Sequence, residues 1–313
     1  MLQKYHICIS APNFIGKILR STGHEDDILH VCETFRTLAL NMRSFPCAKI
    51  NLGLYVTERR PDGYHNLETV FYPIPLCDEL EITEAGQDVL ETAGIAIAGA
   101  AEDNLVMRTV RLLREEGFHI PPLRIRLGKN IPSGAGLGGG SSDAAFTMRM
   151  LNEMFHLGLT DEGMEQRISR LGADCAFFVC HKPVFATGIG DQFEPIELSL
   201  AGKYLLLVKP NDFVSTREAY ANIVPRKPQH KLTESIRRPL SEWARLIAND
   251  FEESVFPQHP VIAAIKQKLY DCGAVYAAMS GSGSSVFGIF DQRPTESITN
   301  SFAPHFVFAA ELG

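Results

Sequence analysis

The chain has 313 residues, of which 45% are apolar and 21% charged, so it can bury a sizeable core in about two domains and is neither fibrous nor disordered. Its 37 Asp and Glu residues outnumber 30 Lys and Arg residues, and the net charge of −7 argues against the broad basic surface of a nucleic-acid-binding protein, so an anionic ligand needs a local site. No stretch is apolar enough to span a membrane, and the first residues lack the pattern of a secretory signal.

The first part of the chain differs in pattern from the rest. Residues 1–43 carry balanced charges and no sustained periodicity, so we expect the compact fold to begin near Ser44. The leader is then either a mobile extension or a start assigned too far upstream. Strands follow at 48–56, 67–74 and 78–83, and Pro61, Asp62 and Gly63 turn the chain between the first two.

Helical spacing of apolar residues then alternates with short strands. A helix is predicted at 104–117, ending at Gly117, and a strand at 122–128. The remaining elements are a helix from the glycine-rich stretch to about Phe155, a helix near 161–171, strands near 175–179, 183–188 and 203–210, helices near 215–222, 238–248 and 260–271, strands at 274–280 and 286–290, a short helix and a last strand at 305–310. This mixture predicts an α+β fold.

The seven cysteines are scattered and include no C-x-x-C pair. They are Cys8, Cys32, Cys47, Cys77, Cys175, Cys180 and Cys272. This usage is typical of reduced, buried thiols, so we expect a cytoplasmic protein. Cys175, Cys180 and His181 lie close in sequence, but their spacing and number do not fit a zinc site.

A glycine-rich stretch carries the strongest chemical signal. Five glycines lie within seven residues, directly before a helix that opens with Ser141 and Ser142, and we expect a hydroxyl side chain to cap that helix. The five are Gly134, Gly136, Gly138, Gly139 and Gly140. Glycines let backbone N–H groups approach an anion closely, and a helix start adds unpaired donors and a positive dipole end. The expected guest is a phosphate group.

Three other kinds of glycine-rich segment fit less well. A Walker loop needs Gly-Lys-Ser/Thr, but the Gly-Lys pairs precede Ile18, Asn130 and Tyr204. Residues 134–139 match G-x-G-x-x-G, yet a dinucleotide fold needs an acidic residue about 20 positions later at a strand end, where this chain is helical. A flexible linker would not lie between an apolar strand and a well-phased helix.

Three ordered segments resemble one family. P-S-G-A-G-L-G-G-G-S-S-D-A-A at 132–145 is similar to the signature loop of the GHMP small-molecule kinases, and C-A-K-I-N-L at 47–52 and S-G-S-G-S-S-V-F at 280–287 fit the same family. The resemblance implies a two-domain fold: a ribosomal-protein-like N-terminal domain at 44–198 that binds ATP, and an α/β-plait-like, substrate-binding C-terminal domain at 199–313. ATP with Mg²⁺ is the implied cofactor.

Further segments narrow the resemblance within the family. R-P-D-G-Y-H at 60–65, D-N-L-V at 103–106 and G-A-D-C-A-F-F at 172–178 resemble the branch that phosphorylates a cytidine diphosphate-linked sugar alcohol in non-mevalonate isoprenoid synthesis. Two departures are Asp143, where asparagine is also common, and Cys175-Ala176 in place of Val-Pro. The alternatives are another GHMP kinase, acting on mevalonate, homoserine or a sugar, and a non-catalytic nucleotide- or RNA-binding module.

The resemblance implies that Lys49 and Asp174 are the catalytic pair. Asp174 would be the general base, and Lys49 would orient the site and offset negative charge. Without the family, a strand lysine is usually a solvated edge charge and an aspartate after Gly-Ala is usually a turn or cap. The apolar residues that follow Asp174 favour partial burial and a charged partner, for which Lys49 is suitable.

The same resemblance implies a site for the cytidine substrate. Tyr64 would stack on cytosine, His65 would bond its edge, and Tyr220 would close the sandwich. Asn51 and Thr216 would bond the erythritol or diphosphate portion. Taken alone, Tyr64 and His65 read as an exposed turn pair and Tyr220 as a core aromatic. We expect no nucleic-acid or membrane partner, and a monomer or homodimer.

ATP is expected to lie on the glycine-rich stretch. Asn104 and Lys129 occupy positions where the family contacts the adenine or nucleotide, although Lys129 could be a surface charge at a strand end. The residues expected to surround the phosphates are Pro132, Ser133, Gly134, Ala135, Gly136, Leu137, Gly138, Gly139, Gly140, Ser141 and Ser142. Ser142 is a candidate Mg²⁺ ligand, and the other ligands are left open because the sequence offers no carboxylate cage.

Overall fold

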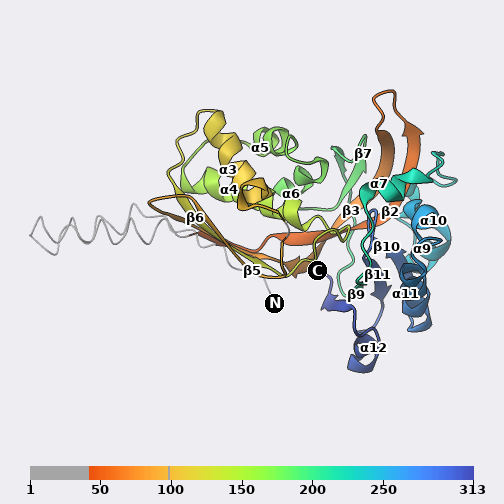
Figure 1. Ribbon diagram of the computed structural model, residues 1–313. Helices are drawn as coiled ribbons and strands as arrows, with labels where there is room; N and C mark the ends of the chain where they lie inside the picture. Colours follow the sequence, from red (N-terminus) through yellow and green to blue (C-terminus); the bar gives the residue numbers. More distant parts are fainter. Residues whose placement is uncertain (1–41, 98) are drawn as a thin grey trace, which may run out of the picture.

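Three four-stranded sheets organise the computed structural model, which describes residues 42–97 and 99–313 (Figure 1). The strands are β1 Met42–Ser44, β2 Cys47–Arg59, β3 His65–Cys77, β4 Glu79–Glu84, β5 Val89–Gly94, β6 Leu123–Lys129, β7 Val184–Thr187, β8 Gln192–Pro195, β9 Tyr204–Lys209, β10 Tyr276–Met279, β11 Val286–Phe290 and β12 Phe306–Glu311. The sheet orders are β1-β4-β6-β5, β2-β3-β7-β8 and β10-β11-β9-β12. Every named strand pair is antiparallel except β5 with β6.

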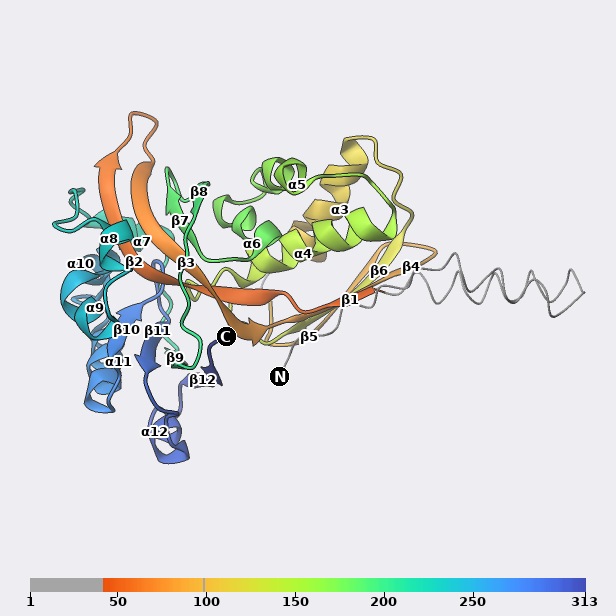
Figure 2. The same ribbon diagram turned by 180° about the vertical axis from the view of Figure 1, so that it is seen from behind.

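Helices cover these sheets at both ends of the molecule. They are α3 Leu105–Glu115, α4 Gly139–Met154, α5 Asp161–Ile168, α6 Phe177–Cys180, α7 Thr216–Ala221, α8 Leu232–Ser235, α9 Leu240–Leu246, α10 Phe251–Val255, α11 Pro260–Asp271 and α12 Glu296–Asn300, with 3-10 turns at Ala101–Asp103 and Ala173–Cys175. Helices α3 to α6 lie together over one end of the long strands β2 and β3, and the other helices surround β9 to β12 (Figure 2). The α+β prediction is confirmed.

Two strands connect the halves of the molecule. Strands β2 and β3 run as a long hairpin from the α4 end to the α7 end (Figure 2). Ile50 and Leu52 of β2 belong to the same buried cluster as Leu205 and Phe287 of the third sheet, so the two halves share a core. The expected domain boundary between 198 and 199 remains a prediction. The expected leader, 1–43, is too long, because Met42 and Arg43 belong to β1 and pair with β4; the expectation for residues 1–41 lies outside the described residues.

The predicted strand at 175–179 is wrong. Cys175 ends a 3-10 turn and Phe177 begins α6, so this apolar run is helical. Periodicity alone does not distinguish a short buried helix from a short buried strand. The run lies in the core formed by the first sheet with α3 and α4, where Phe177 and Phe178 are buried. Strands β1, β5 and β8 and helices α8 and α10 were not predicted, and each is only three to six residues long.

Two further expectations are corrected. Helix α4 is capped by Gly138 without a side-chain hydrogen bond, because the helix begins at Gly139, before the two serines. Cys47 and Cys77 form a disulfide between β2 and β3, where they lie opposite each other, and Cys180 is exposed rather than buried. A pairing between neighbouring strands left no C-x-x-C signal, so the sequence did not reveal it.

Candidate active site

The glycine loop, residues 132–140, joins the end of β6 to α4. Gly134, Gly136 and Gly138 have φ values of +59°, +73° and +71°, which favour glycine. A Cβ at Gly136 would lie 1.9 Å from the carbonyl oxygen of Ser280, so no larger residue fits there. No side chain caps the first turn of α4, so its N–H groups and dipole face the loop. The loop can therefore receive an anion.

A second loop, residues 280–285, supports the first from the opposite half of the chain. The Ser280 hydroxyl donates to the carbonyl oxygen of Gly136 at 2.9 Å, and the Ser285 N–H donates to that of Ala135 at 3.3 Å. Ser280 Oγ also accepts from the backbone N–H of Asn51 at 3.3 Å. All three motifs thus meet directly, because Asn51 belongs to the segment at 47–52 and the backbone N–H of Lys49 donates to the carbonyl oxygen of Leu137 at 3.0 Å.

Lys49 and Asp174 come together beside the glycine loop. The Lys49 Nζ lies 3.6 Å from Asp174 Oδ2 and donates to Gly136 O at 3.0 Å. Lys49 is 3% exposed, whereas the Asp174 side chain is 38% exposed, because the 3-10 turn at Ala173–Cys175 buries Cys175 and leaves the carboxylate at the surface. The two side chains therefore combine a buried cation with a reachable carboxylate.

Burial governs the charge of Lys49. Loss of water lowers the pKa of Lys49, and the nearby Asp174 carboxylate opposes that shift. The Nζ also lies 4.9 Å from the ring centroid of Phe71, a cation–π distance that favours the charged form. The ammonium is thus held by one charged partner, one ring and neutral oxygens.

A chain of hydrogen bonds fixes the position of Lys49. Its Nζ donates to Asn51 Oδ1 at 2.7 Å, and Asn51 Nδ2 donates to Thr69 Oγ1 at 2.9 Å. The Thr69 hydroxyl in turn donates to the carbonyl oxygen of Gly53 at 2.6 Å. Asn51 is 2% exposed and bonded within the protein, and its expected substrate contact remains a prediction. Thr69 gave no sequence signal, since it is one of several polar residues in β3 and belongs to no motif.

Two of the predicted aromatic residues contact each other. The rings of His65 and Tyr220 stack with centroids 4.8 Å apart and an interplanar angle of 24°. Burial raises the pKa of Tyr220, and the Asp174 carboxylate raises it further, so the phenol lies within electrostatic range of that carboxylate. Tyr64 is 62% exposed at the end of the hairpin, and Thr216 is exposed at the start of α7. Of the predicted aromatic set, His65 and Tyr220 are in contact.

A cavity of about 350 Å³ adjoins the glycine loop. Asn104, Lys129, Ser133 and Gly140 line it with the apolar residues Leu90, Ile97 and Leu105. The Asn104 side chain caps α3 by accepting from the N–H of Val106 at 2.9 Å. Both residues expected to contact the nucleotide therefore border one space beside the phosphate loop.

Lys129 is buried rather than a surface charge. Its Nζ donates to Asp78 and, at 2.7 Å, to Asp143 Oδ2. Burial lowers the pKa of Lys129, but the carboxylates of Asp143 and Asp78 outweigh it, so that pKa is raised. Burial also raises the pKa of Asp143 to about 7, against the opposing charge of Lys129. Asp78 Oδ1 accepts from the backbone N–H groups of Asn130 and Ile131 at 2.6 and 2.8 Å.

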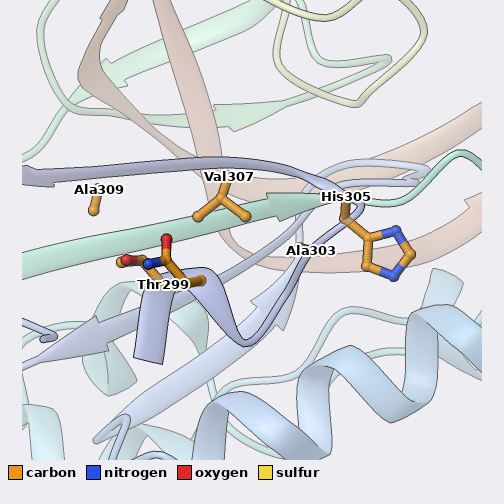
Figure 3. A pocket seen from close by; sticks show the side chains of 6 residues that line it. Thr299, Ala303, His305, Val307 and Ala309 are labelled. Carbon is orange, nitrogen blue, oxygen red and sulfur yellow. The ribbon is translucent and has the colours of Figure 1, made fainter. Parts of the chain in front are cut away.

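Another hollow, of about 450 Å³, lies away from these residues (Figure 3). Side chains of α12, β12 and the segment between them line it, including Thr299, His305 and Val307. It contains none of the predicted site residues. Within residues 42–97 and 99–313, no three His, Cys, Asp or Glu side chains are grouped to hold a metal ion, and no helix is long and apolar enough to cross a membrane.

Comparisons with known proteins agree with this arrangement. Family models for the GHMP kinases N terminal domain and the GHMP kinases C terminal match residues 104–182 and 232–306. The chain is 59% identical over 276 residues to the 4-diphosphocytidyl-2-C-methyl-D-erythritol kinase of Bacteroides fragilis, covering 87% of this chain and all of the relative. The same enzyme of Parabacteroides distasonis is 52% identical over 272 residues, with the same two coverages.

Solved structures extend the comparison. The crystal structure of a 4-(cytidine 5'-diphospho)-2C-methyl-D-erythritol kinase has a TM-score of 0.75 and 29% identity, covering 87% of this chain and 99% of that one. A mevalonate kinase of Methanococcus jannaschii has a TM-score of 0.63 but only 12% identity over 88% of this chain and 98% of that one, so it shares the fold alone.

The close approach at Gly136 predicts a steric penalty. Gly136→Ala should lower the free energy of unfolding by about 2–5 kcal/mol, because the methyl group meets the Ser280 carbonyl and the backbone keeps a positive φ. Gly63→Ala is the matched control, since Gly63 has a φ of +88° and open space around its Cβ position, and should cost only about 1–2 kcal/mol. Urea unfolding measures both, and equal losses would contradict the proposed contact.

The histidine that joins α7 to α11 predicts a pH dependence. His259 Nε2 lies 2.8 Å from Glu218 Oε1 and its Nδ1 3.4 Å from Asp212 Oδ2, and the hydrogen bond to Glu218, with the Asp212 charge, raises the pKa of His259. Its stabilising effect is therefore complete below pH of about 6.5 and is lost as the pH rises through the raised folded-state pKa. The free energy of unfolding of His259→Gln should differ from that of the unmodified chain more at pH 6 than at pH 9.

Urea unfolding at the two pH values measures this difference. His119→Gln is the control, because His119 is exposed and forms no ion pair with any residue at 42–97 or 99–313. The effect of His259→Gln should change more between the two pH values than the effect of His119→Gln. If the effect of His259→Gln is the same at pH 6 and pH 9, the His259 contact does not act through charge.

Proposed function

Because this chain belongs to the 4-diphosphocytidyl-2-C-methyl-D-erythritol kinase family of the GHMP kinases, we propose that it transfers the γ-phosphoryl group of ATP to the 2-hydroxyl of 4-diphosphocytidyl-2-C-methyl-D-erythritol. The observation that carries the proposal is the Lys49–Asp174 pair, 3.6 Å apart beside the glycine loop. The product would be the 2-phosphate, with ADP as the second product.

The pair supports a direct transfer. The hydroxyl oxygen of the substrate forms a bond to the γ-phosphorus while the bond from that phosphorus to the bridging oxygen of ADP breaks. Asp174, which is partly exposed, accepts the hydroxyl proton. Lys49 carries three N–H donors, two of which serve Asn51 and Gly136, so the third is free for Asp174 or a phosphoryl oxygen. Its charge favours the ionised carboxylate and offsets charge on the phosphoryl group.

The glycine loop supports binding of the ATP phosphates, and the adjoining cavity supports binding of the base. Mg²⁺ with ATP would neutralise charge on the β- and γ-phosphates, and such an ion is commonly held by phosphate oxygens with one or two protein oxygens. Asp174, whose side chain is 38% exposed, fits that limited role. Ser142 keeps its lone pairs, since its hydroxyl donates to the carbonyl oxygen of Cys47 at 2.8 Å, but it is fully buried and would reach an ion only after a shift of the loop. A dedicated carboxylate cage is not needed.

The cytidine end of the substrate fits the aromatic residues. A cytosine stacked on Tyr220 needs the ring face that His65 covers, so we propose that His65 moves aside and offers its ring edge to the base. Tyr64, exposed on the hairpin, would cover the other face, and Thr216 would contact the diphosphate. Asn51 is buried against Lys49, and we propose that it positions the ammonium.

Removing the carboxylate tests the chemical step. Asp174→Asn should lower kcat by about 10²–10⁴-fold, because no group then accepts the hydroxyl proton, while the Kd for ADP stays nearly unchanged. Steady-state assays with calorimetric titration of ADP measure the two. Asp291→Asn, an exposed carboxylate paired with Lys203, is the control and should retain full activity. Unchanged turnover in Asp174→Asn would remove this residue from the mechanism.

An acceptor panel tests the substrate. The purified chain should release ADP with the cytidyl substrate and not with mevalonate or homoserine, because His65 and Tyr220 offer aromatic surfaces that those small acceptors do not use. Tyr220→Ala should raise KM for the cytidyl substrate and leave KM for ATP unchanged. ADP release with mevalonate and none with the cytidyl substrate would overturn the proposed function.

A further inference from the structure

One oxygen beside the nucleotide cavity has no partner. The Asp143 side chain is 3% exposed, and its Oδ2 accepts from Lys129 at 2.7 Å. Its Oδ1 is buried and makes no hydrogen bond. A carboxylate oxygen left unpaired in the interior costs free energy, so it calls for an explanation.

The role of Asp143 as a partner of Lys129 does not explain this oxygen. Asp78 already pairs with Lys129 and accepts from two backbone N–H groups. A second buried carboxylate on the same ammonium brings two negative charges against one positive charge, which is unfavourable unless another group compensates. A residue needed only to neutralise Lys129 would be superfluous here.

The position of Asp143 indicates that the compensating group belongs to a bound ligand. Asp143 lines the cavity of about 350 Å³ together with Asn104, Lys129 and two residues of the glycine loop, Ser133 and Gly140. The phosphates of a bound nucleotide would lie at the end of the cavity formed by the glycine loop. Its base would then lie among the remaining lining residues. A hydrogen-bond donor on that base can satisfy an acceptor that the protein leaves unpaired.

We propose that Asp143 is the residue that selects the base of the nucleotide: its Oδ1 accepts a hydrogen bond from the exocyclic amino group of adenine. The inference rests on the proposed function, in which this cavity holds the base of ATP. Lys129 holds Oδ2 in place, and Asp78, anchored by backbone N–H groups, holds Lys129. The carboxylate is therefore oriented before the nucleotide arrives.

The selection works by rejection as well as attraction. Inosine and guanosine nucleotides carry a carbonyl oxygen where adenosine nucleotides carry the amino group. That oxygen would face the buried Asp143 Oδ1 with no proton between the two acceptors. A purine nucleotide with only hydrogen at this position would lose the hydrogen bond without gaining the repulsion. ATP should thus be the best donor, the unsubstituted purine nucleotide intermediate, and ITP the poorest.

The test compares ATP with ITP in the full chain and in Asp143→Asn at pH 9, above the raised pKa of about 7, so that Asp143 carries no proton to donate. The amide has the same shape, keeps an oxygen for Lys129, and can turn its NH₂ group toward the carbonyl of ITP. We expect the ratio of kcat/KM for ATP to that for ITP to fall at least tenfold in the variant. Glu153→Gln, an exposed carboxylate on the same helix, is the matched control and should keep the ratio of the unmodified chain.

Each outcome decides the matter. If Asp143→Asn lowers the melting temperature and slows ATP and ITP equally, Asp143 is only a partner of Lys129 and the proposal is overturned. If the variant does not fold, the three-nucleotide series on the unmodified chain still decides, and ITP used as well as ATP overturns the proposal. Calorimetric titration of ADP and of IDP requires no substrate that accepts a phosphoryl group. If the chain binds ADP more tightly than IDP but transfers no phosphoryl group, this inference stands and the proposed function fails.

Discussion

A buried ammonium needs partners, and the partners of Lys49 assemble the candidate site. Its Nζ contacts a backbone oxygen of the glycine loop, the amide of Asn51 and the carboxylate of Asp174, which come from three separate parts of the chain. An unpaired charge at this depth would cost several kcal/mol, so the fold is most stable when all three segments are in place. The same contacts that stabilise the cation also set the distance between the phosphate loop and the carboxylate.

The supporting loop at 280–285 makes the site depend on both halves of the molecule. Ser280, in the loop between β10 and β11, contacts both Gly136 of the glycine loop and Asn51, the partner of Lys49. The shared core beneath, with Ile50 and Leu205 in one buried cluster, leaves little freedom for the halves to move apart. A site built between two halves is therefore held as rigidly as a site within one.

The sequence predicted the parts of the structure that rest on local pattern. The long strands, the helices at 105–115 and 260–271 and the glycine loop have clear periodicity or turn residues, and the structure contains them. It did not predict α6 or the Cys47–Cys77 disulfide, because a short apolar run fits a helix or a strand and a cross-strand pair depends on register. The roles of Thr69 and Asp78 depend on contacts between distant residues, which no local pattern encodes.

Two buried lysines show how partners decide what a residue can do. Lys129 lies between two buried carboxylates that outweigh burial and raise its pKa, so its charge is fixed and it serves as an anchor. Lys49 has one carboxylate, partly exposed and 3.6 Å away, and burial lowers its pKa. A cation with neutral partners and one loose ion pair gains more from an arriving phosphoryl group than a cation already paired twice. Both lysines lie beside the glycine loop in the fold. The number of buried carboxylates around each one distinguishes the anchor, Lys129, from Lys49, which meets the substrate.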